Sequence, residues 1–481
     1  MQLTNKNQRL QTIQDMKKVF VFCIGGTGIR VMKSITMLMA GGMSTNGYTV
    51  VPIIVDPHLD LEEKKNLHSL IQQYSDIHEA TVKGDGETRL NPLNGFFSSE
   101  IKTLGELDSQ QNDTYDMPGS KQAFGSYINT SGMDVNDINH NLVSTLFSQK
   151  NLNSPLSVGF KGNPNVGTVV LGEMIEGSDW FDAFKNKCEK DDRVFIISSI
   201  FGGTGASGYP LIEKKIREAD TMPAVKNVVM GAVTVLPYYG LKDPVSSGSD
   251  IDSANFYTKT KAALAYYEKN VKSNYLYYAG EETLRAVYEN NEQQQQDKTH
   301  FIEMVAASAL FHFLDQPRPE RTQYLSRALE NDVDSLDLTA MGKGYGTLVK
   351  SAADYMLLRM LMFTLPKERF FPLKKTYGMD GKFYEDKDFQ LLCTFTQRYY
   401  GWYQELASNN RAFAPLHYEN PRNVSNWVAG LILEAKDDSY ILLDMIKAGN
   451  NVKGYGHNNK FRYFMQFAWE AIDNYTKKIL S

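Results

Sequence analysis

Two glycine-rich segments of the chain each follow a short apolar run. Gly25-Gly26-Thr27-Gly28 comes after residues 19–24, and a second segment, residues 202–208 (Gly-Gly-Thr-Gly-Ala-Ser-Gly), comes after residues 194–197. Glycine lets backbone N–H groups approach a phosphate because no Cβ intervenes, and a helix that begins behind such a loop adds partial positive charge. The pair therefore predicts a polyphosphate site enclosed from two sides, although each segment alone is also consistent with a tight turn.

Two further polar segments could also contact a phosphate or its metal ion. Asp56 comes directly after the apolar run 48–55, and residues 162–167 read Gly-Asn-Pro-Asn-Val-Gly. One carboxylate together with phosphate oxygens suits Mg²⁺, but Asp56 could equally cap a turn or helix, and residues 162–167 could be a simple turn. The chain has no Gly-x-x-x-x-Gly-Lys-Ser/Thr motif. A dinucleotide fingerprint read from Gly26 would need a third glycine where Val31 stands.

The elements around these segments alternate between strand and helix. Apolar runs and helical periodicity predict strands and helices in the first part of the chain over 17–24, 30–39, 48–55, 59–74, 169–187, 193–198, 209–219, 227–236, 253–270 and 301–314. This order predicts an α/β fold with a mostly parallel sheet and helices on both faces. Ligands of such sheets bind beyond the carboxyl ends of the strands, which is where both glycine segments would lie.

The rest of the chain is read as an insertion and a helical domain. Residues 75–155 are polar and predict a long irregular insertion with short helices, and the glutamine-rich stretch 289–297 predicts an exposed loop. From about residue 320 the pattern is mainly helical, with helices expected over 345–365, 389–407, 426–433 and 460–480. We therefore divide the chain into a nucleotide-binding domain (1–252), a central helix and catalytic segment (253–315) and a mainly helical C-terminal domain (316–481).

The order of the polar segments resembles that of the tubulin/FtsZ superfamily of GTPases. The second glycine segment resembles the signature Gly-Gly-Gly-Thr-Gly-Ser/Thr-Gly, with Phe201 at the first glycine and Ala206 inserted. Residues 162–167 resemble the FtsZ loop that approaches the γ-phosphate, and residues 232–237 resemble the end of a later strand. The resemblance covers roughly residues 17–315 and is greatest to divergent bacterial tubulin-like proteins.

The resemblance implies GTP or GDP as the ligand and Mg²⁺ as the metal. Asp56 would lie near the phosphates and the metal. The residues that would contact the phosphates are Gly25, Gly26, Thr27, Gly28, Asn163, Gly167, Gly202, Gly203, Thr204 and Gly205.

In the family, a long central helix begins at the nucleotide base, and residues 255–257 (Asn-Phe-Tyr) open the matching helix here. Tyr257 is the candidate for stacking on the base, although it could be a core residue. Lys261, one turn later, stands where the family has Asn or Asp. Lysine offers only hydrogen-bond donors, so it cannot accept from guanine N1–H and N2–H₂, and Asn255 would have to supply that acceptor. Lys261 could instead be a solvated helix residue, and the choice between guanine and adenine stays open.

The family also places an acidic pair after the central helix, where it enters the nucleotide site of the next subunit. Glu303 matches the second acidic position, and His300 stands at the first. The resemblance thus implies hydrolysis on self-assembly, with Glu303 supplied in trans to position the attacking water. Glu303 could also be an exposed helix charge, and His300 a structural residue.

Composition limits the remaining classes of function. The 481 residues carry a net charge of −5, which argues against general nucleic-acid binding. The three cysteines, Cys23, Cys188 and Cys393, have no metal or disulfide spacing, and no apolar signal segment or membrane span is expected. We expect a cytoplasmic protein that self-associates, with a possible protein partner at its helical C-terminal domain. The alternatives are a non-hydrolysing, nucleotide-dependent assembly protein that could bind ATP, and a Rossmann-type oxidoreductase.

Overall fold

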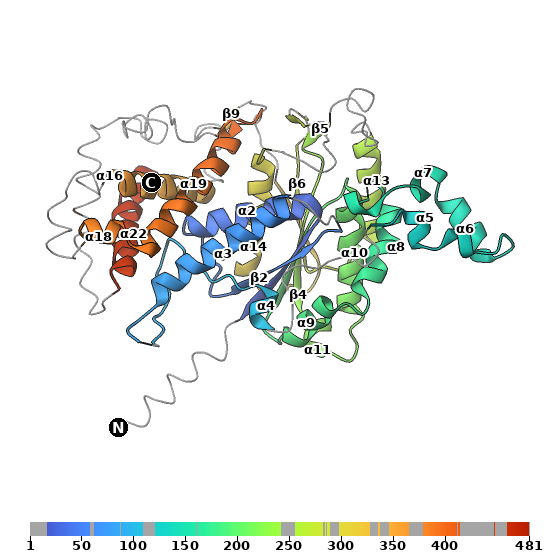
Figure 1. Cartoon of the computed structure of the whole chain (residues 1–481), viewed down its shortest axis with the longest axis horizontal. Coiled ribbons are helices and arrows are strands. Elements are labelled where there is room, and N and C mark those ends of the chain that lie inside the picture. The colour runs from blue at the N-terminus through green and yellow to red at the C-terminus, as the bar shows by residue number, and fades with distance from the viewer. Residues whose placement is uncertain are drawn as a thin grey trace, which may run out of the picture.

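A computed structural model (Figure 1) describes most of the chain. The described residues are 17–57, 62–86, 88–108, 121–160, 162–241, 255–281, 284, 286–288, 298–327, 335–336, 346–364, 379–410, 412–413, 447 and 459–480. The predictions for 289–297 and 426–433 lie outside these residues.

A six-stranded parallel sheet forms the centre of the fold. Its strand order is β2-β1-β3-β4-β6-β8, and every neighbouring pair is parallel. The α/β class and the parallel sheet are therefore confirmed. The strands are β1 (Lys18–Ile24), β2 (Thr49–Val55), β3 (Arg193–Ser199), β4 (Val229–Val235), β6 (Tyr275–Ala279) and β8 (Gln323–Arg327).

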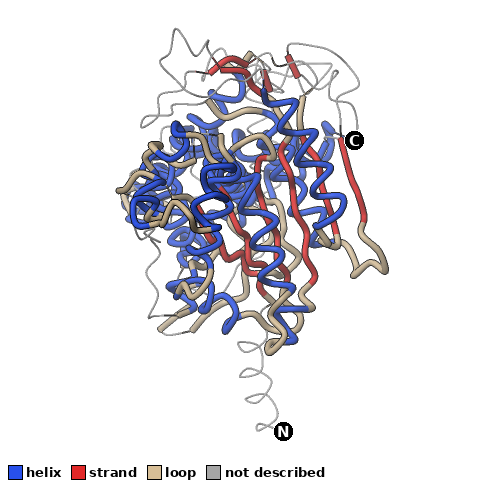
Figure 2. Tube along the Cα trace, turned by 90° about the vertical axis from the view of Figure 1, so that its right-hand side faces the viewer, coloured by secondary structure: helices blue, strands red, loops and turns tan. Residues whose placement is uncertain are grey.

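Helices cover both faces of the sheet, as predicted (Figure 1). In β1 every residue after Lys18 is buried, as expected for a strand with helices on both sides. Figure 2 shows the strands running side by side with helices in front of them. One layer holds α2 (Gly25–Ala40), α3 (Glu62–Val82) and α14 (Phe301–Asp315), and the other holds α8 (Pro164–Ile175), α9 (Asp179–Lys187), α10 (Gly203–Arg217) and α13 (Phe256–Asn270).

Several predicted boundaries were wrong in an informative way. The single helix expected over 169–187 is two helices, α8 and α9, separated around Gly177, whose φ of 72° interrupts the helix. The helices expected over 30–39 and 209–219 begin earlier, at Gly25 and Gly203. The glycine segments therefore form the first turns of α2 and α10 instead of loops that precede them.

The sheet continues past the boundary placed at residue 315. β8 pairs with β6, so a strand of the main sheet lies in the part of the chain that was predicted to be a mainly helical domain. The described part of the remaining chain is mainly helical, as predicted: α16 (Gly346–Thr364), α18 (Gly381–Tyr384), α19 (Lys387–Ala407) and α22 (Lys460–Leu480). Short strands pair as β5 (Tyr239–Leu241) with β7 (Ala286–Tyr288) and as β9 (Ser335–Leu336) with β10 (Ala412–Phe413).

The C-terminal helices pack directly on α2 and α3. A Cβ added at Gly41 would collide with Ser351 of α16. Trp402 of α19 donates from Nε1 to Ser34 Oγ at 3.4 Å, and Arg462 of α22 donates to the carbonyl oxygen of Thr81 at 2.7 Å. Buried apolar residues from the sheet, α2, α3 and these helices form one continuous core.

The insertion predicted over 75–155 contains short helices, as expected, but α3 extends eight residues into it. Among them, α5, α6 and α7 project beyond the helices that cover the sheet (Figure 1). No helix of the described residues is long and apolar enough to span a bilayer. The short helices are α4 (Leu104–Leu107), α5 (Phe124–Tyr127), α6 (Ile138–Leu146) and α7 (Gln149–Leu152).

Candidate functional site

The two glycine segments meet where the strand order of the sheet reverses. From β1 the chain goes outward to β2, then returns past β1 to β3 and on to β4. β1 and β3 are direct neighbours, with Cys23 opposite Ile197 near their carboxyl ends. In open α/β sheets this reversal leaves a crevice beyond the strand ends where ligands bind. The fold thus brings together two segments that are far apart in the chain, with Gly25 against Thr204.

Neither of the two helices that start here is capped by a side chain. The N-cap positions of α2 and α10 are Ile24 and Gly202, and in this part of the described chain neither makes a side-chain cap bond. The first turn of each helix also lacks acidic residues. The N–H groups at a helix start need partners and carry partial positive charge. Two such helix starts side by side therefore favour an anion.

Close packing explains why particular glycines stand here. Gly25 has a φ of 69°, and its Cβ position lies 3.3 Å from Cβ of Thr204, so the two segments touch. A Cβ at Gly28 would lie 2.6 Å from the carbonyl carbon of Cys23, and one at Gly205 would lie 2.5 Å from the oxygen of Ser199. Gly28 and Gly205 therefore have a packing role, as the turn interpretation proposed. Gly26, Gly202 and Thr204 remain partly exposed and accessible to a ligand.

The third segment, 162–167, joins the same cluster. A Cβ at Gly203 would lie 3.0 Å from the backbone nitrogen of Asn163 and 3.2 Å from that of Gly162. The Asn163 side chain caps α8 by accepting from the nitrogens of Asn165 at 3.1 Å and Val166 at 3.4 Å. Its backbone nitrogen lies close to Gly203 but donates to the carbonyl oxygen of Phe160 at 2.8 Å, and its side chain caps α8.

Gly167 does not lie in a loop. It is buried in α8, and a Cβ there would collide with Ser207 Oγ and lie 3.0 Å from the oxygen of Gly203. The prediction that Gly167 closes over a phosphate was wrong, because its missing side chain is needed where α8 packs on α10.

The start of α13 lies beside these segments. The ring of Phe256 packs on that of Phe201, next to the second glycine segment, with centroids 4.8 Å apart. Lys259 Nζ donates to the carbonyl oxygen of Gly162 at 2.8 Å. Tyr257 is 45% exposed, so the core alternative for this residue is excluded. Asn255 and Lys261 are also exposed, which leaves all three predicted base-contacting residues accessible.

Asp56 directly follows β2, the neighbour of β1, at the same edge of the sheet. It is 7% exposed, and a carboxylate at this depth suits Mg²⁺ that is shared with phosphate oxygens. The one group of side chains with metal-ligand spacing in the described ranges is elsewhere: His78, Glu79 and Glu100. Glu100 accepts from Thr49 at the start of β2, so this group lies at the opposite edge, and Arg89 already pairs with both of its carboxylates.

Glu303 is not at the surface. Its side chain is fully buried, and Oε1 accepts from Arg30 Nε at 2.7 Å and from the Tyr238 hydroxyl at 2.6 Å. Its Oε2 accepts from the nitrogen of His300 at 3.1 Å, while His300 Nδ1 accepts from the nitrogen of Ile302 at 3.1 Å. His300 and Glu303 thus cap α14. In this conformation neither residue can enter the site of a neighbouring subunit, which corrects the predicted catalytic placement.

The sequence analysis missed Arg30, which links this buried network to the first glycine segment. Its guanidinium donates to Thr27 Oγ1 at 3.5 Å and to the Tyr238 hydroxyl at 3.2 Å, and it is only 5% exposed. Burial raises the pKa of Tyr238 well above its ordinary value, so this hydroxyl stays protonated and donates to Glu303. An arginine between Ile29 and Val31 in an otherwise apolar helix is a sequence signal of a buried ion pair.

Comparison with known protein families finds no matching family model, and no curated protein matches the sequence.

Proposed function

We propose that the chain binds a nucleoside triphosphate with Mg²⁺ at the three converging segments and hydrolyses it as a tubulin/FtsZ-like GTPase. One observation carries the proposal: the uncapped starts of α2 and α10 meet at the reversal of the sheet, with Gly25 against Thr204. Anion binding needs donors that no side chain of the protein already occupies. The resemblance of the segments to the superfamily supports GTP among the nucleotides.

Each segment has a distinct task in this proposal. The backbone N–H groups around Gly26 contact the α- and β-phosphates, and those around Gly202 contact the β- and γ-phosphates. Asp56 holds Mg²⁺, which neutralises phosphate charge when it is bound. The third segment lies beside the γ-phosphate with the Gly162 nitrogen as its donor, because the other N–H groups of the segment donate within the protein. Tyr257 stacks on the base, with Asn255 and Lys261 at its edge. The arrangement places and orients the phosphates for in-line attack by water.

The burial of Glu303 favours a second candidate function. A carboxylate that is already bound by Arg30 and Tyr238 cannot position a water in another subunit. The chain would then bind nucleotide to control self-assembly or a partner without hydrolysing it. Release of phosphate from GTP, measured over a range of protein concentrations, separates the two: turnover that rises with concentration supports the GTPase, and its absence supports the assembly protein.

Nucleotide binding itself is tested by Gly203→Val. The new side chain would fill the space between Gly203 and the nitrogens of Gly162 and Asn163, so we expect affinity for GTP to fall at least about tenfold, or 1.4 kcal/mol. Gly172→Val in α8 is the matched control, because a Cβ there meets no described atom within 4 Å.

Fluorescent GTP is titrated with Mg²⁺, with ATP and NAD as competitors. Unchanged affinity in a folded Gly203→Val variant would remove the phosphate assignment. Displacement by NAD but not by GTP would replace the proposal with the oxidoreductase alternative, and a preference for ATP would keep the site but make Lys261 the next residue to substitute.

A further inference from the structure

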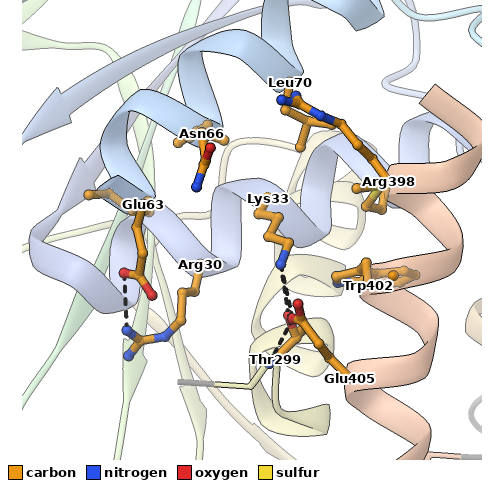
Figure 3. Close-up of a pocket in the computed structure, with 13 residues that line it drawn as sticks. Arg30, Lys33, Glu63, Asn66, Leu70, Thr299, Arg398, Trp402 and Glu405 are labelled. Carbon is orange, nitrogen blue, oxygen red and sulfur yellow. Dashed lines mark hydrogen bonds and ion pairs between the residues drawn. The ribbon is translucent and has the colours of Figure 1, made fainter. Parts of the chain in front are cut away.

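A second pocket lies apart from the glycine segments, between α2, α3 and α19. It has a volume of about 250 Å³ and is also bordered by Thr299, just before α14 (Figure 3). Its apolar wall includes Leu67, Leu70 and Trp402. A volume of this size holds several waters or one small organic molecule. The pocket is thus built on both the sheet layer and the C-terminal helices.

Most charges on the pocket wall are already paired with one another. Lys33 Nζ lies 3.0 Å from Glu405 Oε2, which also accepts from the nitrogen of Thr299 at 3.1 Å and from its hydroxyl at 2.5 Å. Arg30 Nη1 lies 3.5 Å from Glu63 Oε2. Figure 3 marks both pairs with dashed lines. Neither carboxylate is therefore available to bind a cation.

Arg398 differs from the other cations of the pocket. Its Nη2 donates to Ser69 Oγ at 3.0 Å, but its buried Nη1 makes no hydrogen bond, and no acidic residue of the described chain pairs with it. Burial lowers the pKa of this guanidinium. A buried donor without a partner is costly, and a guanidinium offers a planar fork that matches a carboxylate.

The helix that carries Arg398 leaves space for a ligand. Arg398, Gly401, Trp402 and Glu405 border the pocket at helical spacing, so they share one face of α19. A Cβ added at Gly401 meets no described atom within 4 Å. Glycine inside a helix is unfavourable, and here neither backbone conformation nor close packing requires it. Its effect is to widen the pocket.

We propose that this pocket binds a small organic carboxylate, with an apolar body against Leu67, Leu70 and Trp402. The Arg398 guanidinium turns from Ser69 so that its fork takes the carboxylate. The two carboxylates on the wall disfavour a more highly charged anion such as phosphate, because like charges repel at short range. The paired state of Glu63 and Glu405 argues against a cationic ligand. The site requires no nucleotide, so it stands independently of the proposed function.

Hexanoate is the probe for the test, with hexanamide as its neutral match and hexylamine as its cationic match. Binding to the full chain without nucleotide is measured by saturation-transfer NMR and by calorimetry. We expect hexanoate to bind, and hexanamide and hexylamine to bind at least about tenfold more weakly. Arg398→Gln should weaken hexanoate by a similar factor, and Arg398→Lys, which keeps the charge but loses the fork, should weaken it less.

Gly401→Leu tests the place of binding. Its side chain would extend into the pocket, so hexanoate binding should be lost in a variant that remains folded, while Gly172→Leu, at another open glycine in a helix, should bind as the parent does. No binding of hexanoate by the parent chain would overturn the proposal. So would equal binding of hexanoate and hexanamide, or unchanged binding by folded Arg398→Gln and Gly401→Leu variants.

Discussion

Within the described chain, the N-terminal N–H groups of α2 and α10, at the glycine segments, have no side-chain partner, whereas those of α14 do. α2 and α10 begin without a side-chain cap or an acidic first turn. α14 begins with His300 and Glu303, which satisfy its first donors reciprocally. Each helix start needs partners for its N–H groups. The difference shows where the chain provides those partners itself and where it leaves them for a ligand.

The same contrast holds for charge. At the glycine segments, bare backbone supplies the positive potential, whereas between α2 and α14 the charged side chains of Arg30 and Glu303 are buried as a pair. Arg30 is only 5% exposed and Glu303 is fully buried. Burying charges is tolerated only when each is matched by a partner. The starts of α2 and α10 are thus arranged for binding, and the contact between α2 and α14 for stable attachment of the helices to one another.

The largest expected effect is on stability and comes from removing the Glu303 carboxylate that caps α14 and pairs with Arg30. Glu303→Ala leaves the buried Arg30 without its closest partner, so we expect the free energy of unfolding to fall by about 3–5 kcal/mol. Urea unfolding measures the change. The control is Glu218→Ala, which removes an exposed pair with Lys214 and should cost no more than about 0.5 kcal/mol. A loss below about 1 kcal/mol for Glu303→Ala would mean that Glu303 contributes only as a helix cap.

A second buried pair predicts a dependence on pH. Asp354 of α16 is 1% exposed and pairs with Lys350, which also contacts Asp473 of α22. Burial raises the pKa of Asp354 from 3.8 to about 6. The folded state therefore binds more protons than the unfolded state between these values, and this group lowers the free energy of unfolding as pH rises from 3.8 to about 6.

The expected contribution is about 2–3 kcal/mol over that interval, at 1.36 kcal/mol per pKa unit. The free energy of unfolding is measured for the parent and for Asp354→Asn over this pH interval. The difference between the two proteins reports the Asp354 carboxyl alone, because the other titrating groups are common to both. A difference that does not change with pH would show that Asp354 ionises normally in the folded chain.

The smallest expected effect comes from converting an uncapped helix start into a capped one. Gly202 has extended backbone angles suited to an N-cap, so Gly202→Asp should raise stability by a few tenths of a kcal/mol. Its charge should also weaken GTP binding about tenfold. Gly202→Ser caps without charge and should weaken binding less. Equal affinity for GTP in the parent and in Gly202→Asp would place the phosphates elsewhere.

The sequence was most informative where a pattern is local. Four of the six main strands follow from apolar runs, β6 was not predicted, and the two glycine segments lie where strand order predicted. β8 was missed because Gln323–Arg327 is short and largely polar, which gives no apolar run to detect. The break at Gly177 has a local signal, a glycine with positive φ followed by Ser178 at the N-cap of α9, but the helical periodicity of 169–187 outweighed it.

Partners far apart in the chain could not be predicted. Arg30 and Glu303 are separated by 273 residues, and nothing in the local pattern of either names the other. The cap by His300 and Glu303 has a local signal, because the two stand three residues apart. The resemblance assigned them to catalysis, and that interpretation obscured the simpler role.

The central position of β1 has a consequence for how the chain folds. β1 pairs with β3, and Lys18 accordingly bonds Asp192, 174 residues later. At synthesis rates of roughly 5–20 residues per second, β1 emerges about 10–35 s before β3 does. During that interval one edge of an almost wholly apolar strand has no neighbour, and such edges promote aggregation. Parallel pairings of this range are also slow to form, so the nascent chain depends on α2 and β2 to shield β1 until the second half of the sheet arrives.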